Sequence, residues 1–253
     1  MRRAVAVAAL VLLGPFALTA CGGGGSTSSS RTAKLTPVAY VKSAARKTAG
    51  QTSEHVAVRG SVSANGQGLT VSGDGDFAQH SGSMHVDFNA AGLGGAIDAV
   101  LDGTDLYLKS PLFTAALPQG KSWLKLDLSK ATNAGGVDLS TLVAQDPAQT
   151  LARLRSISNV TEVGTEQLGG VDTTHYRGRT ARTGVAPAGV YDLWIGKDDG
   201  YIHRVKIASV PGPKQRLDTT VDFSNFGADV NVAVPPASET FDATNLKIPG
   251  LGG

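Results

Sequence analysis

Apolar and polar residues alternate with a period of two through most of the chain that follows Glu54. Met84, Val86 and Phe88, for example, are each separated from the next by one polar residue. Successive side chains of a strand point to opposite faces, so this pattern predicts strands that bury one face. The predicted strands lie at 56–62, 69–77, 84–89, 97–101, 106–109, 122–128, 160–167, 173–180, 191–197, 201–209, 216–223 and 228–234.

Turn residues such as Asp102-Gly103 separate these segments, which favours an antiparallel meander. The chain also has 32 glycines and only 6% aromatic residues, so its interior would be built from Val, Leu, Ile and Ala. We therefore expect a mainly β (α+β) protein of about 11–12 strands. It should form a single domain from residue 34 to residue 245, followed by an irregular tail at 246–253.

Two helices are expected to pack on the sheet. Thr36 can cap the first helix, Pro37 fits its first turn and Gly50 fits the position after its end, which predicts a helix over 37–49. Asp146-Pro147-Ala148-Gln149 has the spacing of a capping box. A second helix is therefore expected near 146–157, after a shorter helical turn at Leu139–Val143.

The amino terminus has the features of an export signal. Two arginines precede an apolar run of about 14 residues, from Ala4 to Ala17, which is too short for a permanent membrane span. Leu18-Thr19-Ala20-Cys21 then matches the lipobox, the motif that bacterial lipoprotein processing recognises. We predict a signal peptide at 1–20, a lipidated Cys21 with a Gly/Ser tether at 21–33, and a location on the extracytoplasmic face of the cell membrane.

The cysteine and charge content argue against a disulfide-stabilised protein and against a nucleic-acid-binding protein. Cys21 is the only cysteine, so the chain cannot form an internal disulfide. Loss of Arg2 and Arg3 with the signal peptide would leave 21 basic and 21 acidic residues, which gives no support to nucleic-acid binding.

The sequence lacks the spacings that mark catalytic sites. No HExxH pair, GxSxG elbow or phosphate-binding glycine loop is present, so we expect no enzyme, no metal and no cofactor. His85 and His175 fall on polar strand positions and are expected to be exposed. Asp74 and Asp76 are expected to be solvated charges at a sheet edge, and Gly92–Gly95 a loop.

A possible basic patch includes Arg177, Arg179 and Arg204. If their strands are neighbours, these residues would contact anionic lipid headgroups, each contributing about 1 kcal/mol. The alternative is an ordinary solvated strand face.

Several short segments occur in a characteristic order: Leu101-Asp102-Gly103, Gln167-Leu168-Gly169-Gly170, Leu193-Trp194-Ile195 and Phe223-Ser224-Asn225-Phe226-Gly227. Together with the lipobox, the tether and the order of helices and strands, they resemble the LppX/LprAFG family of actinobacterial lipoproteins. The resemblance implies a LolA-like fold, a curved antiparallel half-barrel whose concave face is covered by helices. It also implies a cavity for lipid between sheet and helices.

We therefore expect a membrane-anchored, monomeric protein that binds a lipid or another hydrophobic ligand, with a partner in envelope transport. The residues expected to line the cavity are Met84, Val86, Phe88, Ala99 and Leu101 on the sheet, and Leu151 and Leu154 on the covering helix. One alternative is an interaction or sensor module of the cell envelope that holds no ligand. Another is an unrecognised hydrolase, which would need a His within hydrogen-bond reach of a Ser or Asp in a cleft.

Overall fold

A computed structural model describes residues 35–64, 67–90, 92–130, 147–181, 188–209 and 215–244. The lipobox with Cys21, the tether and the tail at 246–253 lie outside these residues. The same is true of the helical turn expected at Leu139–Val143 and of the expected cap at Asp146.

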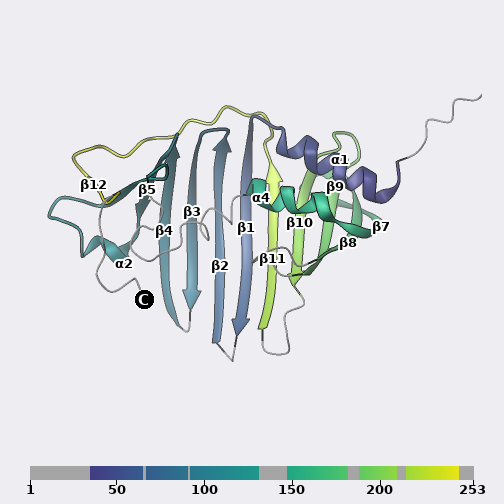
Figure 1. The fold of residues 1–253 in the computed structure, drawn as a ribbon, viewed down its shortest axis with the longest axis horizontal. Coiled ribbons are helices and arrows are strands. Elements are labelled where there is room, and N and C mark those ends of the chain that lie inside the picture. Colours follow the sequence, from purple (N-terminus) through teal and green to yellow (C-terminus); the bar gives the residue numbers. More distant parts are fainter. Residues whose placement is uncertain are drawn as a thin grey trace, which may run out of the picture. The chain divides into compact units, whose positions relative to one another are not determined.

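The described residues form one sheet of twelve strands (Figure 1). Its strand order is β12-β6-β5-β4-β3-β2-β1-β11-β10-β9-β8-β7, and all neighbours are antiparallel except β12 and β6. The expected mainly β fold, with one large antiparallel sheet and few short helices, is confirmed. The strands are β1 Ser53–Ala64, β2 Gln67–Ala78, β3 Ser81–Ala90, β4 Leu93–Asp102, β5 Asp105–Lys109, β6 Trp123–Asp127, β7 Ser158–Leu168, β8 Val171–Thr180, β9 Gly189–Gly196, β10 Ile202–Ser209, β11 Gln215–Ser224 and β12 Thr240–Asp242.

The first helix has the predicted ends. Helix α1 spans Pro37–Ala49, the hydroxyl of Thr36 accepts a hydrogen bond from the backbone N–H of Ala39, and Gly50 follows the last residue. Its Val41, Ala44 and Ala45 are buried, so the helix is held by one apolar stripe. Within the described part of the chain, no helix has the length and apolarity needed to cross a membrane.

The second helix is shorter than predicted. Helix α4 spans Pro147–Arg153 and continues as a 3-10 turn, η1, over Leu154–Ser156. Ile157 already has an extended conformation, because there the chain enters β7. A further short helix that the sequence analysis did not predict, α2 at Pro111–Thr114, is capped by the hydroxyl of Ser110.

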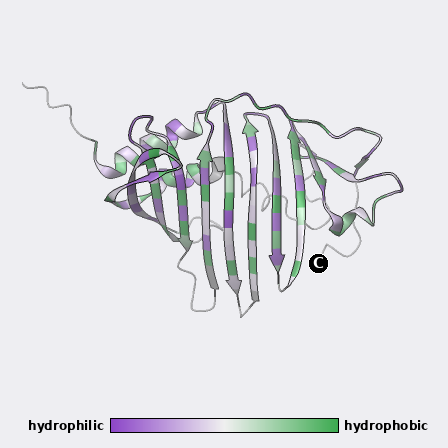
Figure 2. Ribbon diagram, turned by 180° about the vertical axis from the view of Figure 1, so that it is seen from behind, coloured by the Kyte–Doolittle hydropathy of each residue, from purple (hydrophilic) through white to green (hydrophobic). Residues whose placement is uncertain are grey.

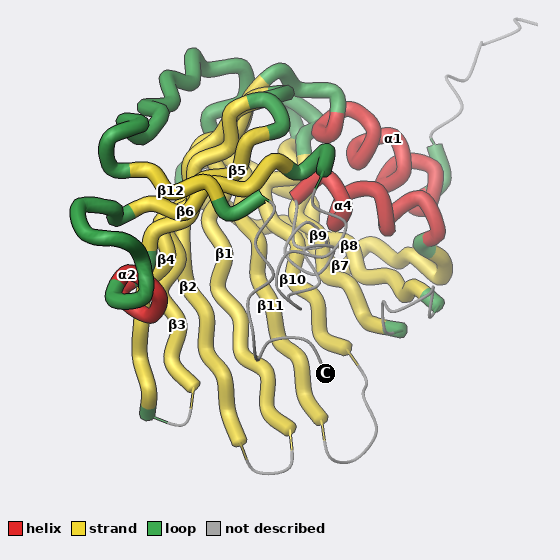
Figure 3. Tube along the Cα trace, turned by 60° about the vertical axis from the view of Figure 1, so that its left-hand side comes forward, coloured by secondary structure: helices red, strands yellow, loops and turns green. Residues whose placement is uncertain are grey.

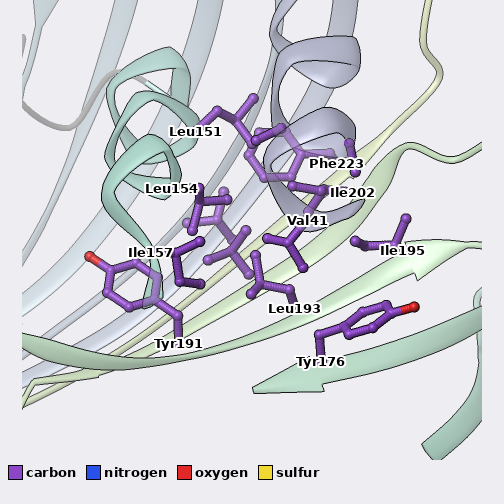
Figure 4. Packing of buried hydrophobic residues seen from close by; sticks show 14 of the residues in the cluster. Val41, Leu151, Leu154, Ile157, Tyr176, Tyr191, Leu193, Ile195, Ile202 and Phe223 are labelled. Atoms are coloured by element: carbon purple, nitrogen blue, oxygen red, sulfur yellow. The ribbon is translucent and has the colours of Figure 1, made fainter. Parts of the chain in front are cut away.

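The main core lies beneath α1 and α4, which cover the end of the sheet formed by β7 to β11 (Figures 1 and 3). Leu151, Leu154 and Val41 from the helices pack there against Leu193 and Phe223 from the strands (Figure 4). A second, smaller core lies at the β6 and β12 end of the sheet. It contains buried Leu126 and Ala243, with Leu108, Leu124, Leu128 and Phe241 packed around them.

Two predictions about the chain after β11 are wrong. Ala228–Val234 forms no strand, although its residues alternate. Beyond Pro236, where no strand was predicted, Thr240–Asp242 forms β12, which pairs in parallel with β6. A strand needs a partner as well as an alternating pattern, and among the described residues it is Thr240–Asp242 that pairs with the edge of β6.

Candidate functional site

One face of the sheet is apolar from one core to the other. The strand register places Met84 opposite Gly75 on one side and opposite Ala99 on the other. The same row of cross-strand partners runs through eight strands, from the main core to the smaller one. Its members are Phe223, Val56, Gly75, Met84, Ala99, Leu108, Leu124 and Phe241.

We name the middle part of this surface the central apolar face. It consists of the residues of β2 to β5 that point to the same side as Met84. Hydrophobic and hydrophilic positions alternate visibly along these long strands (Figure 2). The members of the face are Leu69, Val71, Gly73, Gly75, Phe77, Gly82, Met84, Val86, Phe88, Ala90, Leu93, Gly95, Ile97, Ala99, Leu101, Leu106 and Leu108.

The central apolar face is less deeply buried than the cores beside it. Met84, Val86 and Phe88 are each half-buried, whereas Val56 in the neighbouring strand β1 is fully buried. Among the described residues, Met84, Val86 and Phe88 belong to neither core. The face therefore offers partly covered apolar surface between two regions of tight packing.

The structure places the residues that were predicted to line one cavity in two separate regions. Met84, Val86, Phe88, Ala99 and Leu101 do share one face, with Met84 directly opposite Ala99. The two helical members, Leu151 and Leu154, lie instead in the main core and are almost completely buried (Figure 4). The α4 helix packs at the β7 to β11 end, so it does not stand over Met84 in the way that the sequence suggested.

Glycines on this face were not singled out from the sequence. A Cβ atom added at Gly95 would lie 2.6 Å from Cζ of Phe88, and one added at Gly82 would lie 2.5 Å from Cδ1 of Phe77. Gly92–Gly95, expected to be a loop, contributes Gly94 and Gly95 to β4. The sequence signal was a glycine at an apolar position of a strand next to a strand that carries a phenylalanine, and the register then paired the two residues.

The opposite face of the sheet carries paired histidines and many polar residues, together with the buried cross-strand pair Val100 and Tyr107. Nδ1 of His85 lies 2.6 Å from a carboxylate oxygen of Asp98 in the next strand, and Nδ1 of His55 lies 2.8 Å from Asp76. The hydrogen bond that the His85 ring donates to Asp98 raises the pKa of His85, although partial desolvation opposes this. Asp74 and Asp76 are exposed as expected, but they lie in the middle of the sheet and not at its edge.

His175 is not the exposed histidine that was predicted. Its side chain is only 14% exposed, because the ring stacks on Trp194 at a centroid distance of 4.3 Å. Its Nε2 lies 2.7 Å from Oδ1 of Asp192, while the indole N–H of Trp194 donates to Glu166. Within the described residues, no hydroxyl group hydrogen-bonds to a histidine, and no three His, Cys, Asp or Glu side chains are placed to hold a metal ion.

The arginines of the expected basic patch lie on this polar face, and two of them are paired. Nε and Nη2 of Arg177 donate to Asp192 at 2.8 and 3.2 Å, and this raises the pKa of Arg177. Arg204 makes the same two-pronged contact with Asp222. These carboxylates reduce the net positive charge of the patch. Contact of Arg177, Arg179 and Arg204 with lipid headgroups stays a prediction.

Two Streptomyces proteins are similar in sequence. An uncharacterized 31.2 kDa protein of Streptomyces griseus is 25% identical over 245 residues, covering 83% of this chain and 80% of that protein. A candidate lipoprotein of Streptomyces coelicolor is 29% identical over 133 residues, covering 50% of this chain and 44% of that protein. No family model matches the chain.

The chain is also similar to solved structures. LprF from Mycobacterium bovis superposes with a TM-score of 0.52 at 16% identity, over 79% of this chain and 96% of that one. The chain has the fold of LprF. The resemblance expected from the sequence is thus confirmed at the level of the fold. The lipoprotein LppX of Mycobacterium tuberculosis matches with a TM-score of 0.46 at 19% identity, over 78% of this chain and 98% of that one.

Proposed function

We propose that this protein is a lipoprotein of the cell envelope that binds the acyl chains of a lipid on its central apolar face. The lipobox supports an anchor at Cys21, which would hold the domain beside a membrane and therefore beside a supply of lipid. The relative in Streptomyces coelicolor, a candidate lipoprotein, supports the same assignment. The domain itself performs no chemical reaction.

The continuous apolar row between the two cores carries the proposal. A sheet face that only had to close a core would be covered as completely as Val56 and Phe223 are in the main core. Met84, Val86 and Phe88 are instead half-buried, on a face whose described positions in β2 to β5 bear no charge. Such a surface favours a ligand that is long, apolar and uncharged along its length.

An acyl chain has the right dimensions and energetics. Adjacent strands lie about 4.8 Å apart, so the four strands β2 to β5 present a surface about 15 Å wide. Each methylene group removed from water contributes about 0.8 kcal/mol. A chain of ordinary length laid across this face would therefore be held by burial alone, with no specific polar contact.

Val86→Trp tests the proposal, because Val86 lies in the middle of the face, between Gly73 and Ile97. The indole ring is larger than the valine side chain and would occupy the space of the proposed acyl chain. We expect the variant to remain folded and to lose the lipid that solvent extraction and mass spectrometry recover from the purified wild-type protein. Asn89→Trp, on the exposed polar side of the same strand, is the matched control and should keep its lipid.

The alternative function is an envelope interaction or sensor module without a ligand. It predicts that the wild-type protein yields no extractable lipid apart from its covalent anchor. It also predicts that Val86→Trp is strongly destabilised, because the side chain would be forced into packed surroundings at a cost of about 1–3 kcal/mol or more. Both results together would refute lipid binding on this face.

A further inference from the structure

We propose that Phe77 and Phe88, each lying over a glycine of the neighbouring strand, determine the length of acyl chain that the central apolar face accepts. This inference rests on the proposed function, and it concerns the size of the site and not its existence. Phe88 is the direct cross-strand partner of Gly95, and Phe77 is the direct partner of Gly82.

Both rings lie down on the sheet. A Cβ atom at Gly95 would be 2.6, 3.1 and 3.3 Å from Cζ, Cε1 and Cε2 of Phe88, which are the outer atoms of the ring. The outer end of the ring therefore rests directly on the backbone of β4. At Gly82 a Cβ would be 2.5 and 3.1 Å from Cδ1 and Cε1 of Phe77. Only glycine permits an aromatic ring this close to the strand beside it.

The two rings bound a shallow stretch of the sheet. Along β3, Gly82 and Phe88 are separated by six residues, which corresponds to about 20 Å at 3.3–3.4 Å per residue. Between them lie the rows that contain Met84 with Ala99 and Val86 with Ile97. Phe77 packs against the main core and closes one end of this stretch, whereas Phe88 at the other end belongs to neither of the two described cores. An acyl chain on these rows would therefore extend over the flat ring of Phe88, and an upright Phe88 ring would shorten the stretch.

The glycines of this face fall into two kinds. At Gly95 the obstacle to a Cβ is the end of a side chain, which can rotate away from the sheet. At Gly73 and Gly75 the obstacle is the backbone of β3, with carbonyl oxygens of His85 and Ser83 at 2.3 and 2.2 Å. A methyl group at Gly95 should thus lift a ring into the site, whereas one at Gly73 should disturb the strand pairing itself.

The experiment compares Gly95→Ala with Gly94→Ala in the full-length, acylated protein. Cells are fed photoreactive saturated fatty acids of increasing chain length and irradiated intact, and lipid adducts on peptides from β2 to β4 are quantified by mass spectrometry. The adduct on the Cys21 peptide normalises each measurement. A Cβ at Gly94 meets only ordinary contacts, 3.6 Å to Nδ2 of Asn89 and 3.7 Å to the carbonyl of Phe88, so this variant is the control.

We expect Gly95→Ala to lose adducts of the longest chains about tenfold, while shorter chains and Gly94→Ala are little affected. Adding Phe88→Ala should restore the long chains, because the lifted ring is then absent. Phe88→Ala alone should accept chains longer than the wild type accepts, which tests the inference even if Gly95→Ala fails to fold.

The failures of the two proposals are distinct. If the wild type gives adducts only on the Cys21 peptide, the proposed function is wrong. If the wild type gives adducts on β2 to β4 but Gly95→Ala has the same chain-length profile as Gly94→Ala, the inference about the rings is wrong. An unchanged profile for Phe88→Ala would overturn it as well.

Discussion

Thr48 connects helix α1 to the sheet through a fully buried hydroxyl group. Its Oγ1 donates to the carbonyl of Ala44 at 2.9 Å and accepts from the backbone N–H of Ile202 at 2.9 Å. Both Thr48 and Ile202 are completely inaccessible to solvent. In Thr48→Val the side chain keeps its shape, but the N–H of Ile202 loses its acceptor and no water can replace it.

The expected cost follows from this burial. A buried donor left without an acceptor costs about 1–3 kcal/mol, and a domain of this size loses about 2–4 °C of Tm per kcal/mol. Thr48→Val should therefore lower Tm by about 2–12 °C. Thr48→Ser keeps the hydroxyl and loses one methyl group, about 1 kcal/mol, so it should lower Tm by about 2–4 °C.

Thermal and urea unfolding followed by far-ultraviolet circular dichroism provide the measurement. The informative quantity is the order of the two variants, with valine less stable than serine. A valine variant as stable as the wild type would show that the Ile202 N–H does not depend on Thr48. A serine variant as damaged as valine would assign the effect to packing of the methyl group.

Three further predictions concern separate parts of the chain. Cys21→Ala should abolish metabolic labelling by palmitate, and continued labelling would place the lipid elsewhere. The pKa of His85, measured by NMR titration, should lie above its ordinary value and return toward that value in Asp98→Asn. The stabilisation that the His85–Asp98 pair gives to the fold is present at low pH and is lost as the pH rises through the raised pKa. Gly73→Ala should lower the free energy of unfolding by about 1–3 kcal/mol or more. Gly164→Ala is the control, because a Cβ there meets nothing within 4 Å and should leave the free energy of unfolding unchanged. Equal free energies of unfolding for the two variants would refute the close approach of β2 and β3.

Local features of the sequence predicted the elements well. The cap at Thr36 and the glycine at Gly50 delimited α1 to the residue, because capping depends on side chains within one turn of each other. The alternation around Met84 assigned each strand residue to a face, because neighbouring side chains of a strand point in opposite directions. Ala228–Val234 shows the limit, since alternation without a free neighbouring edge produced no strand.

Contacts between distant residues were decided by the tertiary structure. Sequence alone placed Leu154 on a helix covering Met84, whereas the structure packs Leu154 in the main core, at the β7 to β11 end of the sheet. The pairing of His175 with Asp192 and the position of Phe88 over Gly95 depend on the register between strands. Register is set by how all twelve strands pair and pack together, and no short segment contains that information. The sequence by itself therefore determined the apolar face, and only the folded sheet determined what that face meets.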